Sequence, residues 1–120
     1  MAEKYDERKI ARGEFKDYYS ITLQGWMVNK LDLHGNKLLV YAVVYTYSML
    51  PDSEFAYGEK VLSALCNVSV STIKEILNQL AEERLILVTE LEYKGRKYRT
   101  YRTNFKKVYA CLNTKKDKNK

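Results

Sequence analysis

The sequence has few of the residues that break secondary structure, cross-link a chain or bind metal. It contains one proline and five glycines, so long segments can form regular structure. A single histidine and two distant cysteines leave no Cys-x-x-Cys zinc site and no pair of histidines for acid–base work. No apolar run approaches the roughly 18 residues that a membrane helix needs. We therefore expect no enzyme, no metal or other cofactor, no small-molecule substrate and no membrane partner.

Both cysteines, Cys66 and Cys111, lie within apolar patterns. We interpret them as buried free thiols of a reducing cytoplasm, with a disulfide between them as the alternative. The first residues alternate in charge and lack an apolar stretch, which does not fit a signal peptide. A cytoplasmic location is the expectation.

The net charge of +6 is unevenly distributed along the chain. Residues 1–17 hold five basic and five acidic side chains, and residues 18–93 hold five basic against nine acidic. Residues 94–120 hold eleven basic side chains and one acidic. A positive excess confined to one end indicates a polyanionic partner, most simply nucleic acid. For the lysines after residue 114 alone, a solubilising tail is the simpler interpretation.

The first half of the chain centres on one strongly apolar segment. Alternation over residues 18–23 predicts a short strand, and residues 26–31 predict a short helix. Residues 37–50 are apolar on nearly every side, which predicts a buried central helix that Pro51 ends. Residues 53–57 fit a brief strand or an extended loop.

The second half reads as helix, turn, helix and hairpin. Residues 58–66 predict a helix ended by Asn67 in the left-handed conformation. After a three-residue turn, Ser69 or Ser71 caps a helix that runs to about residue 83. Residues 85–93 and 98–103 predict a hairpin with its turn at residues 94–97, and Asn104 caps a last short helix to about residue 112.

These elements define an α+β, mostly helical fold of the winged helix-turn-helix type, with three core helices, a hairpin wing and a short C-terminal helix. The expected organisation is an N-terminal arm (residues 1–17), one domain (residues 18–112) and a basic disordered tail (residues 113–120). In such folds the second helix of the pair enters the major groove of DNA. The expected reader residues are Ser69, Ser71, Thr72, Lys74 and Asn78. The expected wing contacts are Lys94, Arg96, Lys97, Arg99 and Arg102.

Three tyrosines of the hairpin, Tyr93, Tyr98 and Tyr101, lie among these basic residues. Their rings either stack on bases or brace the hairpin, and the sequence leaves both options open.

Residues 19–103 resemble the winged-helix domains of plasmid, phage and mobile-element replication initiators and replisome organisers (DnaD-like and related families). The segments that carry the resemblance are Ile-Thr-Leu-Gln-Gly-Trp-Met-Val (21–28), Gly-Asn-Lys-Leu-Leu-Val-Tyr-Ala (35–42), Asn-Val-Ser (67–69) and Leu-Ile (85–86) before the hairpin. The resemblance implies binding of double-stranded DNA by Ser71, Thr72, Lys74 and the wing. It also implies a role in DNA replication or transcription regulation.

A second function class stays open beside DNA binding. Some winged-helix domains serve as oligomerisation or protein-docking modules, and the acidic residues 18–93 offer a surface for such contacts. Homodimerisation is compatible with both functions, because DNA readers often dimerise on two half-sites.

Overall fold

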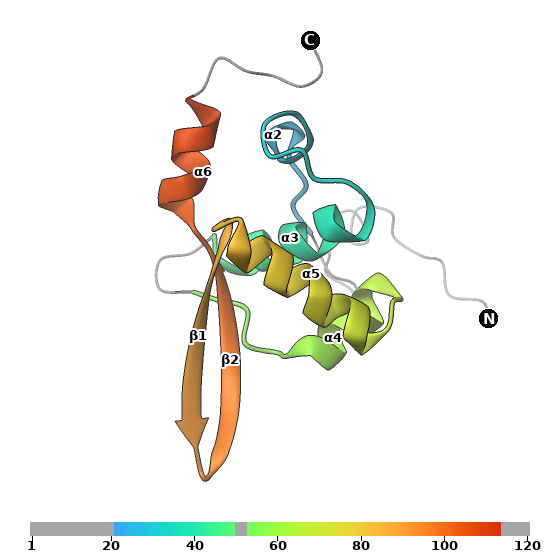
Figure 1. The fold of residues 1–120 in the computed structure, drawn as a ribbon, viewed down its shortest axis with the longest axis vertical. Helices are drawn as coiled ribbons and strands as arrows, with labels where there is room; N and C mark the ends of the chain where they lie inside the picture. Colours follow the sequence, from blue (N-terminus) through green and yellow to red (C-terminus); the bar gives the residue numbers. More distant parts are fainter. Residues whose placement is uncertain (1–20, 50–52, 114–120) are drawn as a thin grey trace, which may run out of the picture.

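The computed structural model describes residues 21–49 and 53–113 (Figure 1). These residues form an α+β fold, mostly helical, with one two-stranded antiparallel sheet. The elements in chain order are α2 (Gly25–Asn29), α3 (Gly35–Tyr47), α4 (Glu59–Cys66), α5 (Val70–Glu82), β1 (Ile86–Tyr93), β2 (Arg96–Thr103) and α6 (Phe105–Leu112). The predicted arm (residues 1–17) and residues 114–120 of the predicted tail lie outside the described residues.

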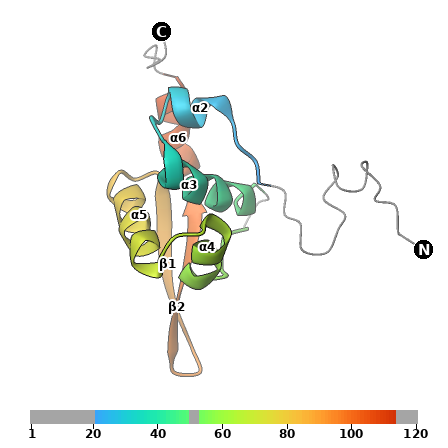
Figure 2. The same ribbon diagram turned by 90° about the vertical axis from the view of Figure 1, so that its right-hand side faces the viewer.

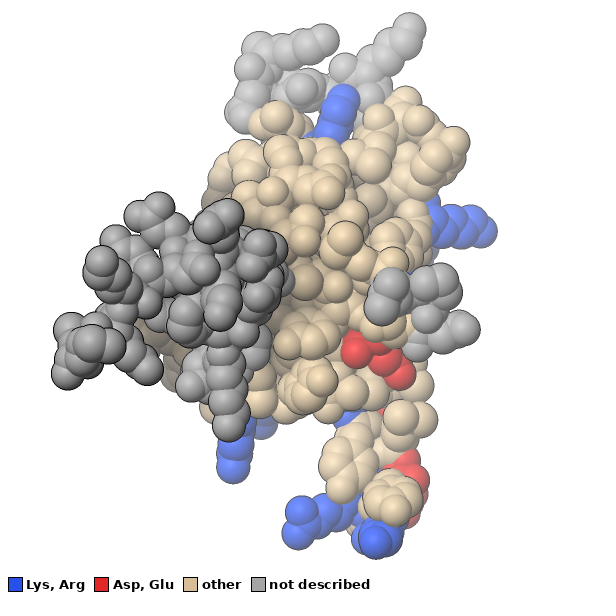
Figure 3. Space-filling view, turned by 180° about the vertical axis from the view of Figure 1, so that it is seen from behind, with Lys and Arg blue, Asp and Glu red and all other residues tan. Residues whose placement is uncertain are grey.

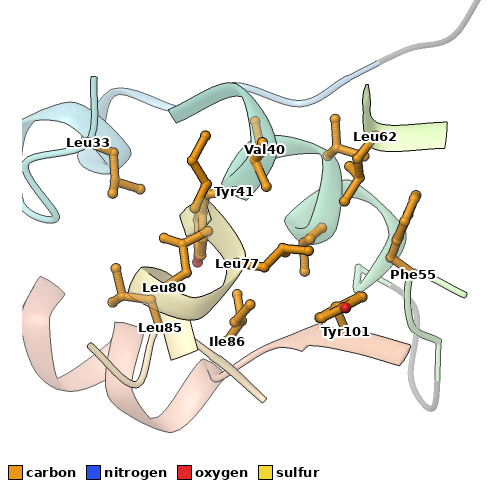
Figure 4. Close-up of a cluster of buried hydrophobic side chains, with 14 of the residues drawn as sticks. Leu33, Val40, Tyr41, Phe55, Leu62, Leu77, Leu80, Leu85, Ile86 and Tyr101 are labelled. Atoms are coloured by element: carbon orange, nitrogen blue, oxygen red, sulfur yellow. The ribbon is translucent and has the colours of Figure 1, made fainter. Parts of the chain in front are cut away.

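Helix α3 is the centre of the fold, and it contacts α2, α4, α5 and β2. Five consecutive residues from Val40 to Val44 are buried, as the apolar pattern predicts for a helix enclosed on several sides. Figure 4 shows how Val40 and Tyr41 of α3 meet side chains of α5 and the hairpin in one core. Burial of this apolar surface is the main force that holds the helices to the hairpin.

Helices α4 and α5 are joined by a tight turn that two polar residues define. Asn67 ends α4 with a φ of 56°, the left-handed conformation that the sequence predicts there. Ser69 caps α5, since its side-chain oxygen accepts a hydrogen bond from the Thr72 backbone N–H at 3.2 Å. Of the two serines proposed as caps, Ser69 is therefore the one that performs this role.

The β1–β2 hairpin projects away from the helices (Figures 1 and 2). Its base is buried through Ile86, Tyr101 and Thr103, whereas residues 87–99 are exposed. The turn consists of Lys94 and Gly95 alone, with φ values of 52° and 76°. The predicted four-residue turn at residues 94–97 is too long, because two residues with positive φ already close a hairpin whose strands twist in the usual sense.

A short stretch before α4 forms a single bridge to the outer edge of β2. Phe55 pairs with Tyr101 in antiparallel fashion, and both residues are buried. Of the two options for residues 53–57, an extended segment with one bridge is the outcome. This segment fixes the start of α4 against the hairpin.

The structure overturns the predicted strand over residues 18–23 in its described part. Residues 21–24 have no strand partner, because the Thr22 N–H donates instead to the side-chain oxygen of Thr46 on α3, at 2.8 Å. The alternation of polarity does not mark a buried face here, since Ile21 contacts the core but Leu23 is exposed. The central helix also ends at Tyr47, three residues before the predicted end.

The prediction of buried free thiols is confirmed for Cys66 and only in part for Cys111. Cys66 and Cys111 are free thiols, the first buried and the second half-buried. Within the described ranges, no helix has the length and apolar character to cross a membrane.

Candidate nucleic-acid interface

The polar face of α5 carries the residues expected to read DNA. Ser71, Lys74 and Asn78 are exposed and follow one another at helical spacing. They lie opposite the buried stripe of Ile73, Ile76, Leu77 and Leu80. Their side chains are therefore available to a ligand that approaches α5 from solvent.

Three of the expected reader residues, Ser69, Ser71 and Thr72, already contact one another through their hydroxyl groups. The hydroxyl of Ser69 lies 2.9 Å from that of Thr72 and 3.2 Å from that of Ser71. Because Ser69 also caps the helix, its oxygen is committed to the first turn of α5. This leaves Lys74 and Asn78 as the members of the set that lie outside this hydroxyl cluster.

The basic residues of the hairpin fall into two groups. Lys94, Arg96, Lys97 and Arg99 are exposed along the projecting half of the hairpin. Figure 3 shows basic side chains gathered at the far end of this projection, with acidic side chains along its flank. The first group therefore forms a positive end that extends beyond the body of the protein.

Arg102 belongs to the other group, because its guanidinium is engaged within the protein. It donates to the backbone oxygen of Ser53 and, at 3.5 Å, to that of Ser48. It also lies 5.3 Å from the centre of the Phe105 ring. Arg102 thus joins β2, the end of α3 and the start of α6, away from the hairpin's far end.

A hollow of about 460 Å³ lies between α5 and the hairpin. We name it the helix–hairpin hollow; among its lining residues are Glu59, Lys74, Asn78, Val88, Arg99 and Tyr101. It brings Lys74 and Asn78 of the expected reader helix together with Arg99 of the expected wing. These residues are far apart in sequence, so the fold alone makes them neighbours.

The residues of this hollow and of the adjoining strands carry charges of both signs. Burial raises the pKa of the Tyr101 hydroxyl, the negative charge of Glu59 raises it further, and the Arg99 guanidinium opposes the rise. On β1, Glu90 lies directly opposite Arg99, and Glu92 lies opposite Lys97. These carboxylates offset part of the charge of two cations, whereas Lys94 and Arg96 have no acidic residue opposite them.

Sequence reasoning did not identify two residues that the structure places at this interface. Tyr57 and Glu59 lie in the segment that Phe55 anchors beside β2, and both face hollows next to the hairpin. Their local pattern carries no sign of this position, since a contact between distant segments creates it. The hairpin tyrosines divide as well: Tyr101 is buried and braces the fold, whereas Tyr93 and Tyr98 are exposed.

No protein-family model, curated protein or solved structure matches the chain. Among residues 21–49 and 53–113, no group of three or more histidine, cysteine, aspartate or glutamate side chains is placed to hold a metal ion.

Proposed function

We propose that the chain is a winged helix-turn-helix domain that binds double-stranded DNA. The observation that carries this proposal is the helix–hairpin hollow, in which polar residues of α5 and a basic residue of β2 share one surface. A capped helix with an exposed polar face beside a projecting basic hairpin suits a duplex, whose groove accepts a helix while its phosphates attract cations.

In this proposal α5 lies in the major groove and supplies sequence discrimination. Lys74 donates to the acceptor atoms of guanine or to a phosphate, and Asn78 suits the donor–acceptor edge of adenine. Ser71 and Thr72, at the start of the helix, suit phosphate or base edges. A replacement of Lys74 or Asn78 should change discrimination between sequences by roughly 1–3 kcal/mol per base contact.

The hairpin supplies most of the affinity through phosphates. Lys94, Arg96, Lys97 and Arg99 are the exposed cations that serve this role, and we leave Arg102 out because its guanidinium is bound within the protein. With about four phosphates neutralised, the logarithm of the affinity should fall against the logarithm of salt with a slope of about −4.

The biological role that we propose follows from the resemblance to initiator and replisome-organiser domains. It is the initiation of DNA replication, or the control of transcription, by a plasmid, phage or other mobile element. The duplex site that such a protein reads is the corresponding partner.

A matched pair of double variants tests duplex binding. Arg96→Ala with Lys97→Ala removes two hairpin charges, and Lys106→Ala with Lys107→Ala removes two exposed charges from α6. Fluorescence anisotropy with a labelled duplex of about 20 base pairs, between about 50 and 200 mM salt, gives the affinity and its slope. We expect the hairpin double variant to make the slope shallower by about 2, from about −4 to about −2. The α6 double variant should leave the slope nearly unchanged. A wild-type affinity that does not respond to salt contradicts the proposal.

Self-association is the second candidate function, and exposed apolar side chains favour it. Leu87 and Leu91 are about half exposed, at 51% and 48%, and point to the same face of β1. Phe105 and Tyr109 on α6 are exposed as well, at 40% and 69%. Exposed apolar side chains of this kind often mark contacts between proteins.

Sedimentation of the protein with and without duplex separates the two functions. Self-association alone would be favoured by two results: the wild type sediments as a dimer that Leu91→Lys dissociates, and its sedimentation coefficient does not change when duplex is added. A monomer or dimer that binds duplex supports the first proposal.

A further inference from the structure

A second hollow, of about 500 Å³, lies along the outer edge of β2, beyond the point where the Phe55 bridge ends. We name it the edge hollow; the residues that matter here are Tyr57, Glu59, Glu90, Lys97, Tyr98 and Arg99. Its volume is in the range of sites that hold small ligands, and it is large enough for one nucleotide. The residues expected to read a duplex on α5 do not line it.

Two exposed aromatic rings line the edge hollow. The side chain of Tyr57 is 62% exposed and that of Tyr98 is 45% exposed. Tyr57 is nevertheless held in place, because its ring centre lies 5.3 Å from that of Tyr47 and 5.6 Å from that of Phe55. A ring fixed on one side and open on the other offers a flat apolar surface to a planar ligand.

The polar groups of the edge hollow suit the rest of a nucleotide. Lys97 and Arg99 bring nitrogen donors to the same space, and although Glu90 lies opposite Arg99, these donors suit a phosphate. Oxygen Oε2 of Glu59 is buried and accepts no hydrogen bond from the described residues. An acceptor in this state lacks a donor, and the N–H groups on the edge of an unpaired base are donors of the required kind.

We propose that the edge hollow binds an unpaired base of single-stranded DNA, with the base stacked on Tyr98 in the space that Tyr57 also lines. Lys97 and Arg99 hold the adjacent phosphates, and Glu59 accepts from the edge of the base. Stacking on tyrosine is open to every base, so this contact adds affinity with little sequence preference. A base inside an intact duplex has both faces covered by its neighbours and cannot enter.

The edge hollow adjoins the proposed duplex site. Glu59, Arg99 and Tyr101 line both hollows, so a duplex on α5 and an unpaired base at the edge of β2 would be bound side by side. This inference rests on the proposed function and extends it: the domain holds DNA at the point where two strands separate.

Single-ring variants test the edge hollow. Tyr98→Ala removes one ring, Tyr98→Phe keeps it, and Tyr109→Ala removes an exposed ring from α6 as the matched control. The probes are a fluorescein-labelled single strand of roughly 12 nucleotides and a blunt duplex, each measured by anisotropy. We expect Tyr98→Ala to weaken single-strand binding about tenfold and duplex binding less than about twofold. Tyr98→Phe and Tyr109→Ala should match the wild type with both probes.

A photo-crosslink supplies a readout that does not depend on a variant. The same single strand carrying 5-iododeoxyuridine should crosslink to the wild-type protein at Tyr57 or Tyr98, as located by mass spectrometry. Crosslinks confined to other residues overturn the proposal, as does an equal loss of single-strand and duplex binding in Tyr98→Ala.

The two proposals fail in different ways. If the duplex binds with the expected salt slope and the single strand does not depend on Tyr98, the edge hollow is not a base site and the proposed function stands. If only the single strand binds, and Tyr98 controls it, the edge hollow stands and duplex binding is wrong.

Discussion

Phe55 and Tyr101 are joined by a reciprocal pair of backbone hydrogen bonds. The Phe55 N–H donates to the oxygen of Tyr101 at 2.7 Å, and the Tyr101 N–H donates to the oxygen of Phe55 at 2.9 Å. Both side chains are buried in the core that Figure 4 shows. This bridge holds the start of α4 against β2, and it thereby sets the position of Glu59 beside Arg99 in both hollows.

Phe55→Ala should be among the most destabilising single changes in the chain. The side chain is fully buried, so its removal leaves a cavity where three segments meet and should cost about 3–5 kcal/mol of the free energy of unfolding. Urea denaturation followed by circular dichroism measures the change. Leu23→Ala, at a side chain that is 56% exposed, is the control and should change stability by less than about 0.5 kcal/mol. A similarly small change for Phe55→Ala would contradict the role given to the Phe55 side chain in the core.

The parts of the fold that follow from local pattern were predictable from the sequence. The apolar stripe of α5, the caps at Ser69 and Asn104, and the left-handed Asn67 all depend on residues within a few positions of one another. The hairpin is predictable in the same way, because Gly95 can adopt the positive φ that its turn requires.

The remainder depends on contacts between distant segments. No neighbouring residue signals that Phe55 pairs with Tyr101, and this pairing is what brings Tyr57 and Glu59 to the interface. The same limit applies to Arg102, whose sequence context resembles that of Arg99. Arg102 differs from Arg99 because its guanidinium donates to the backbone oxygens of Ser48, at the end of α3, and of Ser53.

The left-handed conformation of Asn67 predicts opposite effects for two small replacements. At a φ of 56°, glycine has no side-chain clash, so Asn67→Gly should be neutral or stabilise by a few tenths of a kcal/mol. Asn67→Ala places a Cβ in a conformation that alanine disfavours and should cost about 1 kcal/mol. Urea midpoints compare the two variants with the wild type, and equal values for both would rule out the conformational explanation.

Arg102 and Arg96 should separate stability from DNA affinity. Arg102→Ala removes the guanidinium that donates to the backbone oxygens of Ser48 and Ser53. This loss should lower the free energy of unfolding by about 1–3 kcal/mol. Arg96→Ala, at an exposed side chain, should leave stability within about 0.5 kcal/mol and weaken duplex binding. Thermal unfolding and duplex anisotropy, both on each variant, test the pair. The assignment is wrong if the two arginines exchange these effects.

Tyr41 predicts a loss of stability at high pH. Its ring is fully buried on α3, and burial raises the pKa of its hydroxyl from 10.0 to about 12. Because the folded protein holds this proton more tightly than the unfolded chain, the stabilisation is complete below pH 10. It falls as the pH rises through the window from 10 to about 12, in total by about 2–3 kcal/mol.

Urea denaturation between pH 9 and about pH 11 measures this dependence, with an expected loss of roughly 1 kcal/mol from Tyr41 by the upper end. Tyr41→Phe keeps the ring and removes the proton, so its stability should fall less steeply with pH. Part of the slope should persist, because burial also raises the pKa of Tyr101. Tyr109→Phe, at a side chain that is 69% exposed, should follow the wild-type curve. If Tyr41→Phe follows it too, proton loss from Tyr41 does not drive unfolding, because the variant would carry every other titrating group unchanged.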